Sequence, residues 1–155
     1  MDSLPRKMLL QGCLGITLLG SAAAAAPYLS SLYWNLWWID AVTPSPGAAK
    51  YSFATVDTAT QQVLDHHIHR ETFYERACLQ MAFEYEHADR CPLILQTGLS
   101  LFPSSWRLNF LYGYINTQFL HQPAQGAYYY RLAAQQPEAP LFVHTLGKSP
   151  PHLPR

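Results

Sequence analysis

"WRLNFLYGYINTQFL", residues 106–120, and "GAYYYRLAAQQP", residues 126–137, follow one another with a short polar break between them. Both place small residues at helical intervals among large aromatic ones, and the second ends at a proline. Small side chains let two helix backbones approach, rings fill the space beside them, and proline stops the helix so that the chain can reverse. The two stretches therefore predict a pair of helices packed against each other.

The second half of this pattern also occurs earlier in the chain. In each copy a small residue is followed by a large apolar one, another small one and a proline: Cys91, Leu95, Gly98 and Pro103, then Gly126, Tyr130, Ala133 and Pro137. The two prolines lie 34 residues apart and the two leading small residues lie 35 apart. Two copies at matching intervals predict a helical repeat.

This pattern resembles the tetratricopeptide repeat, which has a period of 34 residues and carries it in its second helix. Trp106, Gly113 and Tyr114 extend the resemblance into the first helix of the later unit. It covers about residues 72–137, two units, with a third degenerate unit possible at 34–69. The resemblance implies an all-α fold of antiparallel helical hairpins, a fragment of an α-solenoid; an unrelated helical bundle is the alternative.

Caps and breaks predict the other helices, and no segment alternates with the period of a strand. Two helices are expected before residue 70: an aromatic one at 30–41 starting at Ser30 or Ser31, and one at 57–69 starting at Asp57 or Thr58. The next two are expected to start with a capping box of Thr72 and Glu75, and with Asp89 as cap and Pro92 in the first turn. The last three are one capped by Ser104 or Ser105, one with Pro123 in its first turn, and a short one at 139–147. The aromatic and the short helix are expected to cover the ends of the array.

The first residues predict a membrane segment. Residues 8–26 carry no charge, follow Arg6 and Lys7, and would form a helix of roughly 28 Å, close to the hydrocarbon thickness of a bilayer. A secretory signal cleaved near Ala25 and a buried soluble helix are the alternatives. A retained anchor is favoured because Pro27 crowds the cleavage site and an aromatic stretch typical of a membrane interface follows.

The expected domains are an anchor at 1–27, an aromatic juxtamembrane helix and linker at 28–50, a helical domain at 51–148 and a tail at 149–155. The expected location is a bacterial-type inner membrane, crossed once, with the amino end in the cytoplasm and the helical domain in the periplasm. Hydrophobic residues make up 49% and charged ones only 13%, so some apolar surface should meet lipid or a partner. Ten basic residues balance ten acidic ones, which gives no field to recruit nucleic acid.

Cys78 and Cys91 take facing positions in the predicted hairpin. In an oxidising compartment they are expected to form a disulfide, with two buried free thiols as the alternative.

"DHHIHRE", residues 65–71, is the other candidate cluster. On a helix its side chains supply only pairs on one face, whereas zinc needs three or four ligands. A solvated polar face is expected, with no metal and no cofactor. A metal site or metal-dependent hydrolase using His66, His67 and His69, or a pH-sensitive contact, is the alternative.

No nucleophile elbow, glycine-rich phosphate loop or zinc-protease motif occurs, so no catalytic residue is predicted and the chain is not expected to be an enzyme. The resemblance implies a groove lined by first helices. By position, its residues are Arg76, Gln80, Phe83 and Glu84 from one unit and Arg107, Tyr114, Thr117 and Gln118 from the next. The expected function is a membrane-anchored scaffold or assembly subunit that binds other proteins of an envelope complex. The alternative is a structural subunit whose membrane segment and aromatic helix form the interface.

Overall fold

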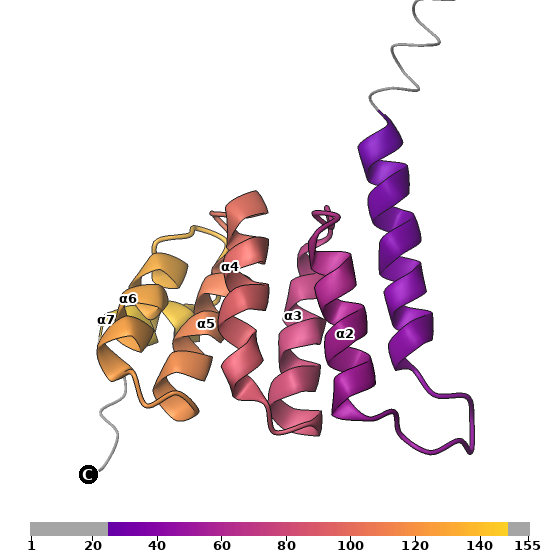
Figure 1. Ribbon diagram of the computed structural model, residues 1–155. Coiled ribbons are helices and arrows are strands. Elements are labelled where there is room, and N and C mark those ends of the chain that lie inside the picture. Colours follow the sequence, from indigo (N-terminus) through magenta and orange to yellow (C-terminus); the bar gives the residue numbers. More distant parts are fainter. Residues whose placement is uncertain (1–24, 149–155) are drawn as a thin grey trace, which may run out of the picture.

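A computed structural model describes residues 25–148, and every regular element in that range is helical (Figure 1). The prediction of an all-α fold is confirmed. A helix at 25–42, which we call the aromatic helix, is followed by α2 (Phe53–Leu64), α3 (Glu71–Leu79), the π-helix η1 (Gln80–Glu84), the 3₁₀-helix η2 (Ala88–Arg90), α4 (Cys91–Leu101), α5 (Trp106–Gln118), α6 (Pro123–Ala134) and α7 (Leu141–Lys148). They follow one another across the molecule in chain order, from the aromatic helix at one side to α6 and α7 at the other.

Helices α3 and α4 form an antiparallel pair. Cys78, near the end of α3, is joined to Cys91, at the start of α4, by a disulfide with a Cα–Cα distance of 4.8 Å. Further along α4, Gly98 lies against the root of Tyr74, earlier in α3: a Cβ atom at residue 98 would stand 2.7 Å from the Tyr74 Cγ. The two helices therefore run in opposite directions. Each of the two contacts involves a small residue of α4, Cys91 at one and Gly98 at the other.

Helices α5 and α6 pack in the same way. A Cβ atom added at Gly113 would lie 2.8 Å from the Tyr130 ring and 3.0 Å from the Gly126 carbonyl oxygen. Gly126 in turn faces Thr117, whose hydroxyl is too close to leave room for a Cβ atom. The two backbones come together because neither glycine has a side chain. The small residues singled out at the sequence level thus mark the contacts between helices.

The side chains of the core fall into two groups. The larger group runs from Trp38 on the aromatic helix to Ile115 on α5 and includes the fully buried Tyr74 and Tyr112. The smaller group, at the carboxyl end, is built from Ala133, Ala139 and Val143, with half-buried Trp106 and Phe110 packed against it. Helix α7 is thus attached through a small core of its own.

Three predicted helix starts agree with the structure. Ser105 caps α5, where its hydroxyl accepts a hydrogen bond of 3.0 Å from the Leu108 amide. Pro92 and Pro123 lie in the first turns of α4 and α6, where a missing N–H costs nothing.

Other predicted boundaries are wrong. The aromatic helix is already helical at residue 25, so neither Ser30 nor Ser31 caps it. Helix α2 is capped by Ser52, whose hydroxyl accepts from the Thr55 amide, and it ends at Leu64 instead of residue 69. His67 adopts a left-handed φ of 47°, which no α-helix accommodates, so residues 65–70 form a loop.

The predicted caps of α3 and α4 are also wrong. Thr72 and Glu75 lie inside α3, whose N-cap is Arg70 and has no side-chain cap bond, so they form no capping box. Asp89 lies within η2, which leads directly into α4, so it does not cap that helix.

The predicted membrane anchor, residues 8–26, falls outside the described residues except for its last two, as does the tail at 149–155. Among residues 25–148, no helix combines the length and the hydropathy that crossing a bilayer requires.

Candidate partner-binding groove

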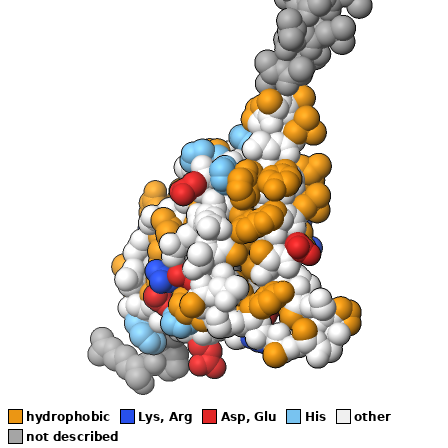
Figure 2. All heavy atoms as spheres, turned by 45° about the vertical axis from the view of Figure 1, so that its right-hand side comes forward, with side chains coloured by type: hydrophobic (Ala, Val, Ile, Leu, Met, Phe, Trp, Pro, Cys, Tyr) orange, Lys and Arg blue, Asp and Glu red, His pale blue; other side chains and the backbone are white. Residues whose placement is uncertain are grey.

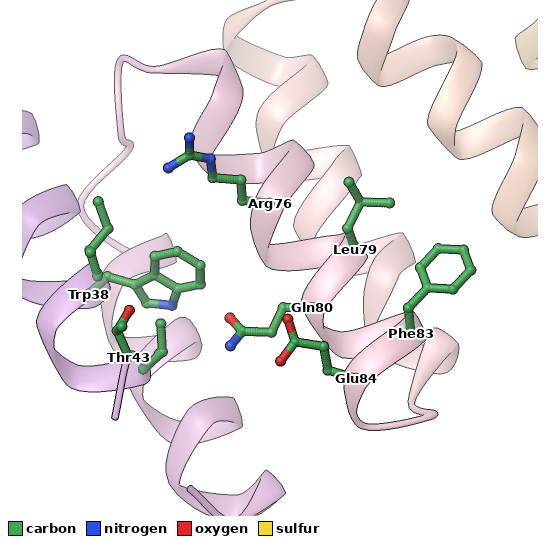
Figure 3. Close-up of a pocket in the computed structure, with 9 residues that line it drawn as sticks. Trp38, Thr43, Arg76, Leu79, Gln80, Phe83 and Glu84 are labelled. Carbon is green, nitrogen blue, oxygen red and sulfur yellow. The ribbon is translucent and has the colours of Figure 1, made fainter. Parts of the chain in front are cut away.

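A hollow of about 500 Å³ lies between the aromatic helix and the continuous helix formed by α3 and η1 (Figure 3). Its lining divides into an apolar half and a polar half: Trp38, Ile39, Val42, Leu79 and Phe83, then Thr43, Arg76, Gln80 and Glu84. Mixed walls of this size suit large apolar side chains whose neighbours need polar partners. We call this hollow the groove.

Trp38 forms a rigid wall of the groove. Its indole Nε1 donates a hydrogen bond of 2.9 Å to the Thr60 hydroxyl, which itself donates to the Val56 carbonyl oxygen at 2.8 Å. The indole also meets the Phe73 ring edge-on at a centroid distance of 5.1 Å. Because both ends of the ring are held, the wall keeps its shape without a ligand.

The opposite wall contains a π-helix. Three of the polar and aromatic lining residues, Gln80, Phe83 and Glu84, belong to η1, which continues α3 without a break. A π-helix widens the turn by one residue, and such turns are frequent at functional sites. Gln80 and Glu84 are four residues apart and lie side by side at one end of the groove.

The charges of the groove are unevenly neutralised. Glu84 is paired with Lys50, at 3.7 Å between Nζ and Oε2, and the same ammonium donates to the Glu84 carbonyl oxygen at 2.6 Å. Arg76 is exposed and lies towards the other end. Within residues 25–148, no carboxylate lies within ion-pair distance of Arg76. The groove therefore offers a cation to an incoming acidic group.

Lys50 also lies over the Tyr85 ring, 4.4 Å from its centroid. Burial and then the charge of Glu84 raise the pKa of Tyr85. Its hydroxyl stays protonated at neutral pH and donates to the Tyr51 carbonyl oxygen at 3.1 Å, which holds the chain beside the groove in place.

An aromatic cluster extends the apolar surface beyond the groove towards α5. Phe83 is 53% exposed, which is high for a phenylalanine. Its ring meets Phe119 edge-on at 5.3 Å and lies 6.4 Å from Tyr114. A partner segment that entered the groove could therefore continue over these three rings.

The structure brings together five of the eight residues expected in the groove. Arg76, Gln80, Phe83 and Glu84 line it, and Tyr114 joins them through the Phe83 ring. The other three lie elsewhere, as described next.

Arg107 lies over the Trp106 ring and lines a different hollow, which also contains Glu71 and Glu138. Thr117 is buried against α6, where its hydroxyl donates to the Gly113 carbonyl oxygen, so it offers nothing to a partner. Gln118 is exposed on α5 and does not line the groove.

Sequence reasoning missed the wall contributed by the aromatic helix. Trp38 and Val42 are spaced four residues apart, as a helical face requires, and this signal was available. The helix was expected to cover the end of the array instead of facing a groove.

The two other sequence candidates behave differently. The sulfur atoms of Cys78 and Cys91 are bonded in the structure, while the oxidation state of the two thiols in a cell stays a prediction. The expected pairing of Asp65 with His69, and of His67 with Glu71, on one helical face is wrong, because residues 65–70 are a loop. In the described part of the chain, no three His, Cys, Asp or Glu side chains gather closely enough to hold a metal ion.

Comparisons of the chain with protein-family models, with curated proteins and with solved structures give no match. The function is therefore argued from the geometry of the groove.

Proposed function

We propose that this chain is a membrane-anchored protein-interaction module that holds a segment of a partner protein in the groove. The observation that carries the proposal is a hollow lined by both Trp38, which a hydrogen bond to Thr60 holds in place, and the exposed Phe83, with the unneutralised charge of Arg76 beside them. Aromatic and arginine side chains in such positions contribute a large share of binding energy at protein interfaces.

The chemistry of the groove defines the partner segment. A hollow of about 500 Å³ whose apolar lining includes Ile39, Leu79 and Phe83 accepts large apolar side chains. Arg76 suits a carboxylate on the same segment, because its planar guanidinium can bind one with two hydrogen bonds. The expected occupant is a helical or extended segment with apolar anchors and an acidic residue at one end.

The tetratricopeptide resemblance supports the same proposal. The close contacts at Gly98, Gly113 and Gly126 within the two antiparallel pairs are consistent with such a repeat. The groove lies between the aromatic helix and α3, which would be the first helices of successive units. In that family the first helices line the surface that receives a partner.

The membrane anchor and the periplasmic location are part of the proposal. The uncharged run at 8–26 supports an anchor, and the Cys78–Cys91 pairing supports an oxidising compartment. The partners would be other subunits of the same envelope complex.

The test is co-purification of the full chain from native membranes in a mild detergent. Arg76→Glu and Phe83→Ala should each reduce recovery of the partner at least about ten-fold, as expected for central interface residues. Arg131→Glu and Tyr128→Ala are matched controls, because both residues are exposed on α6, away from the groove. Equal recovery by all four variants would rule out the groove as the binding site.

A second candidate function is favoured by the exposed apolar face of the aromatic helix: a small structural subunit that assembles through its membrane segment and this helix. Replacing residues 8–24 with an unrelated membrane-spanning sequence separates the two. Binding in the groove predicts that partner recovery survives the replacement, whereas assembly through the membrane segment predicts its loss.

A further inference from the structure

The aromatic helix has an apolar face that the rest of the domain leaves uncovered. Its members lie at spacings of one, three and four residues and are between 46% and 66% exposed: Tyr28, Leu29, Leu32, Tyr33 and Leu36. Figure 2 shows hydrophobic side chains gathered along this helix, beside the residues that are not described. We call these five residues the outer stripe.

The opposite face of the same helix holds it to the domain. Ser31, Asn35, Trp38 and Val42 are buried there. The helix already packs on the domain through this face, so the outer stripe is not needed for folding. Five large apolar side chains in contact with water therefore call for a separate explanation.

The charge pattern indicates what covers the outer stripe. Between Lys7 and Asp40 the chain has no charged residue, a run of 32 residues that includes the whole stripe. As a helix this run would be roughly 48 Å long, against about 40–45 Å for a bilayer with its headgroup layers. In the sequence the proposed anchor at 8–26 is followed directly by Pro27 and Tyr28, so the stripe begins where the proposed anchor ends.

The loop at residues 65–70 places a polar rim beside the stripe. The His66 ring stacks on Trp34 at a centroid distance of 3.8 Å, and the His69 amide donates to the Ser31 hydroxyl at 2.7 Å. The His69 ring also lies 5.6 Å from Tyr28. Exposed imidazoles thus lie alongside the stripe, next to tyrosines, a combination that suits the boundary between headgroups and acyl chains.

We propose that the outer stripe rests on the lipid bilayer, so that the aromatic helix leaves the membrane leaning on this face and holds the domain against the headgroups. Helix tilts of up to about 40° are found in membranes and would bring both Leu32 and Leu36 to the interface. The residues of the loop at 65–70 then lie at headgroup level. This inference rests on the anchor in the proposed function; it does not depend on what the groove binds.

The experiment uses the full chain in vesicles of phosphatidylethanolamine with a smaller amount of phosphatidylglycerol. Benzoylphenylalanine, a photoreactive amino acid, is introduced as Leu32→benzoylphenylalanine or Leu36→benzoylphenylalanine, with Tyr128→benzoylphenylalanine as the control at a similarly exposed site on α6. After illumination, intact mass spectrometry identifies the adducts. Lipid adducts at 32 and 36 should exceed those at 128 at least about five-fold, because an interfacial helix buries its apolar face among acyl chains.

Each other outcome overturns the inference in a distinguishable way. A chain that resists alkaline extraction but forms no lipid adduct at Leu32 or Leu36 keeps its anchor and loses the proposed contact. A covalent dimer at these positions assigns the stripe to a second copy of the chain. A chain that alkaline extraction removes from the vesicles disproves the anchor and the contact together, while the groove is still decided by the Arg76 and Phe83 variants.

Discussion

Gly98 offers the most direct test of the packing between helices. It lies in α4 against Tyr74, which is fully buried, so there is no free space for an added methyl group. The added Cβ atom would stand 2.7 Å from the Tyr74 Cγ, 2.9 Å from its Cβ and 3.0 Å from the Leu108 Cδ1. The first two atoms are at the root of the tyrosine side chain and can move only if α3 moves with them.

Two opposing effects set the size of the change. Extra volume in a well-packed core costs about 1–3 kcal/mol, whereas replacing glycine by alanine inside a helix gains about 1 kcal/mol. Gly98→Ala should therefore lower the free energy of unfolding by about 1 kcal/mol in spite of its better helix propensity. Gly98→Leu, which adds three further carbon atoms, should lower it by about 3 kcal/mol.

The assay is urea unfolding of the full chain in a mild non-ionic detergent, followed by circular dichroism. Ser100→Ala is the control, because Ser100 is exposed in the same helix and its hydroxyl donates only to the Thr97 carbonyl oxygen of the preceding turn, a hydrogen bond exposed to water. If Gly98→Ala were stabilising by as much as Ser100→Ala or more, α4 would not lie against Tyr74. The close approach of the helices, on which the proposed repeat depends, would then be refuted.

Two further predictions concern the same hairpin. Replacing Cys78 and Cys91 by serine should lower the free energy of unfolding by about 3 kcal/mol, because the bond closes a loop of 13 residues. Urea unfolding of the unsubstituted chain with and without reductant checks this. Equal stability under the two conditions would mean that the thiols are free in solution. Burial raises the pKa of Tyr74 to about 12, against a smaller lowering effect of the Ile68 backbone. The unfolded chain, with an ordinary tyrosine pKa of about 10, therefore loses this proton first, so stability is unaffected below that pH and falls as the pH rises towards about 12. Tyr74→Phe should remove this part of the alkaline loss, and an unchanged profile would show that the hydroxyl reaches water.

Local spacing was enough to find the helix contacts. The pattern of small residues, large residues and proline pointed to Gly98, Gly113 and Gly126, and each lies where two helices touch. Such contacts could be predicted because the small residues recur at helical intervals within each helix, although the atoms that they meet belong to the neighbouring helix. Ser105 could be predicted because its capping bond spans three residues.

Features that depend on distant residues could not be found in this way. Tyr33 and Trp38 belong to the same aromatic helix, yet five residues on an α-helix correspond to a rotation of about 140°, so the first faces outwards and the second inwards. Nothing in the local sequence indicates that α3 continues as a π-helix at Gln80, because that turn depends on the packing around it. The repeat pattern therefore did not predict the side of the groove that the aromatic helix forms.

The separate small core at the carboxyl end has a consequence for how the molecule opens. Helix α7 is held by Val143 and by a hydrogen bond of 2.7 Å between His144 Nδ1 and the Ala134 carbonyl oxygen, and its core shares no buried residue with the larger group around Tyr74. Its amide protons can therefore exchange with solvent through a local detachment that leaves the rest of the chain folded. Exchange at α7 is therefore expected to be faster than exchange in the helices of the larger core, to which Trp38 and Val42 of the groove belong.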